Sequence, residues 1–289
     1  MTAFMAKRRK KKKSGFKSKL VLLLFLAALL FIAYIILSNR NNAGSGKGEL
    51  YELSLELAIP QLAPEVKSQV IEHLGYTVSY NPRHKNPNWV AYELTAEELQ
   101  GKESRNGSFI PDPLASGDQA STKDYTRSGW DRGHLAPAAD MAWSKEAMRE
   151  SFYLSNISPQ APGLNRGKWK SLEDFTRDNA RRYGKLLVVT GPVFKEGDGM
   201  GCIGKNKVTV PDAFYKVLLM NDNGLSGIGF YFDNTDSKNR LQSHAISIDS
   251  VESITGIDFF YKLPDNIEEQ VERSYSWDKW STVSTRKEK

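Results

Sequence analysis

Residues 128–141 read SGWDRGHLAPAADM. This stretch places one histidine, one arginine and two acids within thirteen positions, and its glycine and proline residues disfavour a long regular element. An isolated histidine is more often a hydrogen-bonded core or surface residue than a catalytic one. Here the neighbouring charged residues favour a reactive site, and we take His134 as its candidate base.

Other segments extend this pattern in both directions along the chain. They are WVAYEL at 89–94, RNGSF at 105–109, FYLSNISPQ at 152–160, LNRGKW at 164–169, VTGPVF at 189–194, VPDAFYKV at 210–217 and TGIDFF at 255–260. Together with DRGH at 131–134, these segments resemble the DNA/RNA non-specific endonucleases, the ββα-metal (His-Me finger) nucleases related to mitochondrial endonuclease G. The resemblance covers about residues 74–264.

The resemblance implies both a fold and an activity. The expected fold is α+β, an antiparallel sheet flanked by helices and carrying the ββα-metal element. The expected activity is metal-dependent hydrolysis of phosphodiester bonds in DNA and RNA, with 5′-phosphate ends and one Mg²⁺ or Mn²⁺ ion per site. The expected partners are therefore nucleic acids.

The resemblance also implies roles for individual residues. His134 is expected to act as the general base and Asn165 to bind the metal ion. Arg105 and Arg132 are expected to offset charge on the phosphate, and Arg105 also to bind the substrate. Glu173 is expected to orient water bound to the metal.

Two further polar residues of these segments have expected roles. The resemblance implies that Asn156 holds the substrate or supports the metal site, and we expect Asp131 to position either its loop or the imidazole. Each assignment has a simpler alternative. Asn156 can be a turn residue, Arg105 and Glu173 can be solvated charges, and Asn165 can be only the N-cap of the amphipathic helix expected at 168–183.

The positive charge is unevenly distributed. The net charge is +6, but residues 1–19 hold nine of the 40 basic residues and no acid. The remaining chain has 31 basic against 34 acidic residues, a net charge of −3. A nucleic acid must then be held by a local cluster of positive groups and a metal ion. The distribution argues against a passive DNA-coating protein with a broad basic face.

The N-terminal region predicts a membrane anchor. Residues 20–37 contain no charge and would span about 27 Å as a helix, close to the hydrocarbon thickness of a bilayer. The basic residues 1–19 favour a cytoplasmic N-terminus, followed by a flexible linker at 38–48 and an endonuclease domain at 49–289 outside the cytoplasm, periplasmic or extracellular. Two alternatives are a signal peptide cleaved near residues 38–46, which would give a secreted protein, and a nucleic-acid-binding or nuclear-targeting role for residues 7–13.

Residue patterns predict the remaining elements. Strands are expected at 76–80, 89–94, 186–190, 213–220, 227–233 and 244–248, and helices at 64–74, 144–153, 168–183, 251–254 and from 265 to about 280. The single cysteine, Cys202, excludes an intramolecular disulfide and is expected to be buried.

Two questions about function stay open at this point. A membrane-tethered nucleic-acid binding or uptake protein with the same fold, but without turnover, is an alternative to an enzyme. The sequence does not set the oligomeric state, and a homodimer is one option. Nor does it separate scavenging, DNA uptake, defence and toxin roles.

Overall fold

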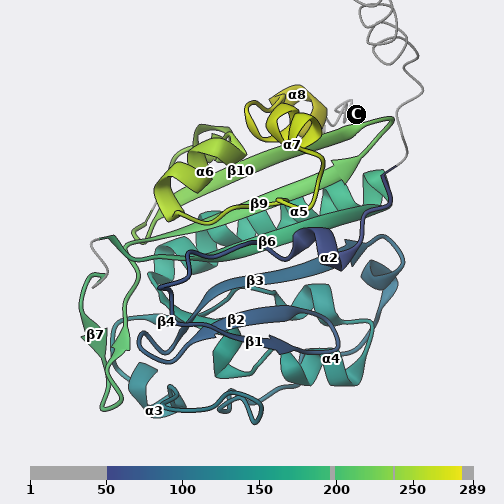
Figure 1. Ribbon diagram of the computed structural model, residues 1–289. Coiled ribbons are helices and arrows are strands. Elements are labelled where there is room, and N and C mark those ends of the chain that lie inside the picture. The colour runs from purple at the N-terminus through teal and green to yellow at the C-terminus, as the bar shows by residue number, and fades with distance from the viewer. Residues whose placement is uncertain (1–50, 196–198, 237, 282–289) are drawn as a thin grey trace, which may run out of the picture. The chain divides into compact units, whose positions relative to one another are not determined.

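One seven-stranded sheet crosses the endonuclease-like region in the computed structural model, which describes residues 51–195, 199–236 and 238–281. All neighbouring strands are antiparallel, in the order β1-β2-β3-β6-β9-β10-β11 (Figure 1). The strands are β1 (Gln69–Glu72), β2 (Thr77–Asn81), β3 (Asn86–Thr95), β6 (Lys185–Val193), β9 (Ala213–Asn221), β10 (Leu225–Asp233) and β11 (Ala245–Ile246).

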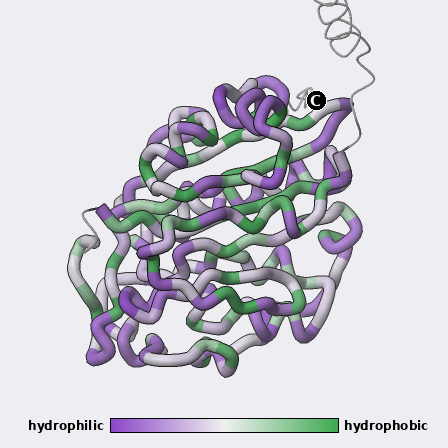
Figure 2. Tube along the Cα trace, viewed as in Figure 1, coloured by the Kyte–Doolittle hydropathy of each residue, from purple (hydrophilic) through white to green (hydrophobic). Residues whose placement is uncertain are grey.

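The central strands are buried on both faces, as β9 illustrates. Phe214 and Leu218 point into one hydrophobic core, and Tyr215 and Val217 point into another. This follows from the two-residue period of side chains along a strand. Hydrophobic residues accordingly run along the strands, and hydrophilic residues dominate the outer helices (Figure 2).

Different helices cover the two cores. The first core contains residues of the long helix α5 (Lys170–Tyr183). Its C-cap is Gly184, with φ +84°. The second contains residues of α2 (Leu55–Ala58), α6 (Ile248–Thr255) and α7 (Asp265–Glu272). The other helices are α3 (Thr122–Tyr125), α4 (Lys145–Glu150) and α8 (Trp277–Trp280), with short turns η1 (Glu98–Gln100), η2 (Ala138–Met141), η3 (Leu154–Asn156), η4 (Leu164–Trp169) and η6 (Leu241–His244). The α+β class with helices flanking an antiparallel sheet is as expected.

A second, two-stranded sheet carries the segment quoted first. Its strands β4 (Asp131–His134) and β5 (Ile157–Gln160) pair antiparallel, with His134 opposite Ile157. The π-helical turn η4 and then α5 follow β5, which completes a ββα unit. A short strand therefore holds residues 131–134, although their glycine had suggested an irregular segment. A third sheet, the hairpin of β7 (Cys202–Ile203) and β8 (Val208–Thr209), lies outside this unit.

Several predictions from residue patterns are wrong. Residues 64–74 form no helix but contain the edge strand β1, because pairing with β2 decides their conformation. The helix expected after residue 264 is broken into α7 and α8, and only residues 245–246 of the last predicted strand are extended. Cys202 is exposed on the β7–β8 hairpin.

The predicted anchor falls outside the described residues, as do the basic tail at 1–19 and the linker at 38–48. Among residues 51–195, 199–236 and 238–281, no helix is both long enough and apolar enough to span a bilayer.

Candidate active site

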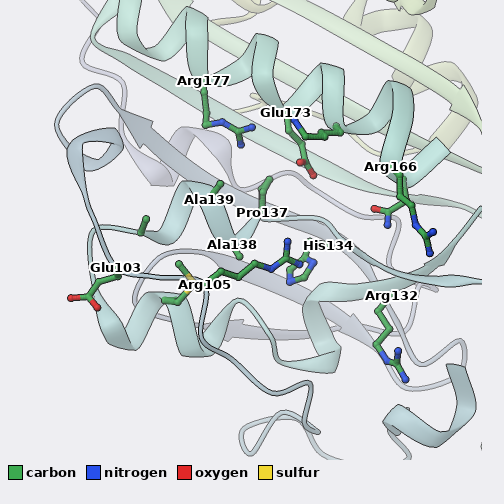
Figure 3. A pocket seen from close by; sticks show the side chains of 14 residues that line it. Glu103, Arg105, Arg132, His134, Pro137, Ala138, Ala139, Arg166, Glu173 and Arg177 are labelled. Carbon is green, nitrogen blue, oxygen red and sulfur yellow. The ribbon is translucent and has the colours of Figure 1, made fainter. Parts of the chain in front are cut away.

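A cavity of about 600 Å³ lies beside the ββα unit. Its walls come from the loop before α3, from β4 and the segment after it, and from η4 and α5 (Figure 3). The residues that line it are Glu103, Arg105, Arg132, His134, Pro137, Ala138, Ala139, Ala142, Met148, Asn165, Arg166, Lys170, Glu173 and Arg177. The structure thus brings His134, Arg105, Arg132, Asn165 and Glu173 to one cavity, whereas Asn156 and Asp131 do not line it.

His134 ends strand β4 and is almost fully buried, with 7% of its surface exposed. Phe109 and Phe152 pack around its ring, at centroid distances of 5.4 and 5.1 Å. Its Nε2 atom is buried and has no hydrogen-bond partner among the described residues. A buried polar atom without a partner is rare and costly.

The environment keeps this imidazole neutral. Burial, and then the positive charge of Arg105, lower the pKa of His134 from 6.5 to about 3. Figure 3 shows the Arg105 side chain lying beside the ring, and its guanidinium carbon is 5.7 Å from the centroid of Phe152. A neutral imidazole can accept a proton at physiological pH.

Asn156 does not face the cavity, as a residue that binds substrate would. It is fully buried, its Nδ2 donates to the carbonyl oxygens of Ala136 and Ser151, and its Oδ1 accepts from the Ala136 amide. In these three bonds, both polar atoms of the Asn156 side-chain amide are engaged by backbone groups. Contact with substrate is therefore not what the structure supports, and Asn156 instead fixes the segment that follows His134.

Asn165 lies in the second position of η4, a π-helical turn of a kind often found at functional sites. It makes no side-chain capping bond to η4 or to α5, so the N-cap alternative is wrong. Its Nδ2 donates to Asp131 Oδ2 at 2.9 Å, and no hydrogen bond to its Oδ1 occurs in the described part of the chain. The amide oxygen is therefore the atom left to bind another group from the cavity.

Asp131 fixes the neighbourhood of Asn165 and not the imidazole. Besides the bond to Asn165, it accepts two hydrogen bonds from Arg166, from Nε at 2.8 Å and from Nη2 at 2.6 Å. Partial burial would raise the pKa of Asp131, but the bonds from Arg166 and Asn165 hold it below its usual range. The carboxylate stays charged and ties β4 to η4.

Glu173 projects from α5 toward His134 across the cavity (Figure 3). Burial raises the pKa of Glu173 above its usual range, and the charge of Lys216 opposes that rise. No hydrogen bond or ion pair to this carboxylate is present within the described ranges. A partly buried carboxylate that faces a cavity without an ion-pair partner is not simply a solvated charge.

Buried charged residues near Glu173 interact with it electrostatically. Asp140 is 1% exposed, pairs with Arg177 at 2.8 Å and accepts a hydrogen bond from the hydroxyl of Tyr92. Lys216 is fully buried, and its Nζ lies 5.2 Å from the ring centroid of Trp169. Our sequence analysis missed these residues. A lysine inside the apolar run 213–220, and an arginine one helical turn after Glu173, were the available signals.

Two cations of the cavity have no carboxylate partner. Five basic residues line it against two acids, a local excess of positive charge. Arg166, Lys170 and Arg177 form ion pairs with neighbouring aspartates. Among the described residues no ion pair involves Arg105 or Arg132. These two remain free to meet an anion.

Arg132 is held in a fixed orientation. Its Nη2 donates to the carbonyl oxygen of Thr122 at 2.6 Å. Its guanidinium carbon is 5.5 Å from the ring centroids of both Phe109 and Tyr125. The planar guanidinium stacks well on aromatic rings and suits bidentate recognition of a phosphate.

Comparison with known proteins identifies this arrangement. Residues 54–266 match the sequence profile of the DNA/RNA non-specific endonucleases. The chain belongs to that family. It is 36% identical over 231 residues to the mitochondrial endonuclease G of Bos taurus, covering 75% of this chain and 74% of that one. It is also 36% identical to nuclease C1 of Cunninghamella echinulata var. echinulata, covering 69% of this chain and 86% of that one.

A solved structure agrees with this assignment. The crystal structure of the EndoG/EndoGI complex contains a chain that aligns with a TM-score of 0.67 at 29% identity, over 78% of this chain and 95% of that one. This endonuclease is thus a phosphodiester hydrolase of the endonuclease G type, as its sequence predicted, and its family is metal-dependent. The family is one of endonucleases, so the matches favour an enzyme over a binding protein without turnover.

Proposed function

We propose that this chain is a metal-dependent, sequence-non-specific endonuclease that cleaves DNA and RNA to 5′-phosphate ends, with His134 as general base. The observation that carries the proposal is that His134, whose imidazole is kept neutral by burial, lines the same cavity as Asn165, Arg105 and Arg132. A phosphodiester in that cavity would meet a base, a ligand for a cation and two arginines.

His134 would activate the attacking water. A neutral imidazole nitrogen of His134 accepts the proton of a water that is in line with the scissile bond, and the water oxygen then attacks phosphorus. The pKa of about 3 in the free protein ensures that the imidazole is unprotonated before substrate binds. An anionic phosphodiester near Arg105 offsets the charge that lowers this pKa, so the imidazole becomes a stronger base when substrate is present.

Arg105 and Arg132 would hold the phosphate. Neither has a carboxylate partner within the described ranges, so a phosphate replaces no existing ion pair. Charge accumulates on the phosphate oxygens as the bond to water forms, and fixed guanidinium groups stabilise that charge. Contacts to phosphate carry little base information, which accounts for weak sequence preference.

The residues present fit a hard divalent cation. Asn165 offers an amide oxygen without a hydrogen-bond donor in the described part of the chain, and Glu173 offers an unpaired carboxylate across the same cavity. Mg²⁺ prefers oxygen ligands and keeps several waters. We propose that Asn165 binds Mg²⁺, or Mn²⁺, and that Glu173 orients a water of its shell. The ion, when bound, supplies Lewis-acid stabilisation of a phosphate oxygen and of the leaving 3′ oxygen.

A plasmid assay on the full-length chain tests this function. We expect Mg²⁺ or Mn²⁺ to support conversion of supercoiled plasmid to nicked and then linear forms, and degradation of a transcribed RNA, both stopped by EDTA. The new 5′ ends should accept a labelled phosphate from polynucleotide kinase only after phosphatase treatment. Cleavage that persists in EDTA, or 5′-hydroxyl ends, would contradict the proposal.

We also propose that residues 20–37 anchor the enzyme in a membrane, with residues 1–19 cytoplasmic and the endonuclease domain outside the cytoplasm. The uncharged run and the preceding nine basic residues support this topology. Protease added to cells whose outer membrane, if present, has been removed should digest the domain, and a cytoplasmic control protein should survive. Protection of the domain would refute the topology. Release of active protein into the medium would indicate that the N-terminal segment is cleaved.

A further inference from the structure

Three acidic side chains meet on the face of the large sheet opposite the active site. Asp249 and Glu252 belong to α6 and Glu272 ends α7, and both helices lie over β10 (Figure 1). One carboxylate oxygen from each residue lies within 4.8 Å of the others. These helices cover the second hydrophobic core, whereas α5 and the cavity belong to the first.

The central member of this cluster is buried and unsatisfied. Glu272 is 4% exposed, and its Oε1 has no hydrogen-bond partner among the described residues. Burying a carboxylate without a partner costs several kcal/mol, so such groups normally bind a proton, a base or a metal ion. This second observation distinguishes the cluster from the exposed acidic groups that are common on protein surfaces.

No basic side chain balances the cluster within residues 51–195, 199–236 and 238–281. None of its three acids forms an ion pair there, and two more acids, Asp258 and Glu268, lie nearby. Burial and then these neighbouring carboxylates raise the pKa of Glu272 to about 9, and burial raises that of Glu252 to about 7. These carboxyl groups therefore have no basic partner to compensate them when they ionise.

We propose that Asp249, Glu252 and Glu272 bind a divalent cation, with Ca²⁺ as the best fit. Calcium takes six to eight oxygen ligands at roughly 2.3–2.6 Å in flexible geometry, so two of its ligands are separated by at most about 5 Å, and three oxygens within 4.8 Å of one another can share one such ion. Magnesium requires stricter octahedral geometry at about 2.1 Å.

The remaining details of the cluster agree with a bound cation. One oxygen of Glu252 accepts a hydrogen bond from the Phe259 amide, which fixes the carboxylate and leaves its other oxygen for the ion. Asp249 is at least partly exposed, so waters can complete the coordination shell. The ion would join the first turn of α6 to the last residue of α7 and hold both helices on the sheet. This is a structural role, separate from the catalytic ion.

Thermal unfolding of the full-length protein tests the proposal. With Mg²⁺ held constant, we expect added Ca²⁺ to raise the Tm of the unchanged protein by about 5 °C or more near saturation, the shift that mass action gives for a domain of this size. Glu272→Gln and Asp249→Asn should each lose most of that rise. Glu269→Gln is the matched control, because it removes the same charge from an exposed position of α7 and should retain the rise.

The rival explanation is that Glu272 simply keeps a proton. The two explanations differ in what pH changes: a retained proton makes total stability fall as pH rises, with or without calcium, whereas a calcium site makes the calcium-dependent part of the Tm grow. A raised folded-state pKa means that the stabilising proton is lost as pH rises toward 9, so a protonated Glu272 gives falling stability from pH 6 to 9. A calcium site needs the ionised carboxylates, so the calcium-dependent rise in Tm should grow over that range.

Each result decides the matter. A calcium-dependent rise that Glu272→Gln abolishes supports the site, and so does an equal rise with another divalent ion that this variant abolishes. A rise that survives unchanged in both Glu272→Gln and Asp249→Asn, or no rise with Ca²⁺, Mg²⁺ or Mn²⁺ beyond that of the catalytic ion, overturns it. If Glu272→Gln does not fold, Asp249→Asn decides alone, because Asp249 is at least partly exposed and its replacement should not prevent folding.

Discussion

Replacing His134 with alanine is expected to lower the rate of plasmid nicking by roughly 10²- to 10⁴-fold, the range contributed by a positioned general base. The loss should appear in kcat, because the imidazole acts on the attacking water and adds little to binding of the phosphate. Arg105, Arg132 and Asn165 remain in place in this variant, so its affinity for DNA should change little. The measurements are single-turnover nicking rates and DNA binding in Ca²⁺ or EDTA.

The same variant should fold normally. The Nε2 atom of His134 is buried without a partner among the described residues, so alanine removes an unsatisfied polar group as well as ring contacts. His84→Ala is the matched control, because His84 lies outside the cavity and stacks on Phe194. It should cleave at the unchanged rate. Turnover by His134→Ala at the level of this control would refute the base assignment.

The lowered pKa of His134 also predicts a pH effect on stability. Its folded pKa of about 3 lies below the unfolded value of 6.5, so the unfolded chain binds the proton more readily. The associated stability is present above pH 6.5 and is lost as pH falls from 6.5 toward 3. Between pH 6.5 and 4, the unchanged protein should therefore lose more of its free energy of unfolding than His134→Ala does.

The sequence indicated which residues would meet in one cavity because they lie in short, recognisable segments. His134 and Asn165 are thirty-one positions apart, and the ββα unit brings both to one cavity. The helix at 168–183 was also predictable, because α5 keeps apolar residues on one face over four turns. The charge pattern pointed correctly to a local basic site, which Arg105 and Arg132 provide.

Non-local contacts explain what the sequence did not predict. Asn156 is polar and follows a helix, and only the folded chain shows that its amide is used by Ala136 and Ser151. Lys216 lies in the centre of a strand, and its electrostatic interaction with Glu173 depends on how α5 packs on the sheet. The edge strand β1 was missed for the same reason, since its partner β2 and not its own periodicity sets its conformation.

Replacing Asn165 with alanine is expected to cut the metal-dependent rate by at least about two orders of magnitude, since losing even a supporting group of a metal site costs 10- to 100-fold. The structure gives Asn165 no capping bond to lose, so its melting temperature should change little. The measurement is the nicking rate as a function of Mg²⁺ and Mn²⁺ concentration. A variant that only melts earlier, with an unchanged rate per folded molecule, would contradict the ligand role.

Asp131→Asn separates binding of the ion from its positioning. Asp131 orients the Asn165 amide through a 2.9 Å bond and holds Arg166 by two more, but it does not line the cavity. Its replacement should raise the Mg²⁺ concentration for half-maximal activity by about 10- to 100-fold. Saturating metal should then restore much of the rate, which it cannot do for Asn165→Ala, because in that variant the ligand atom itself is gone. Equal, irrecoverable losses in both variants would mean that Asp131 takes part directly in the reaction.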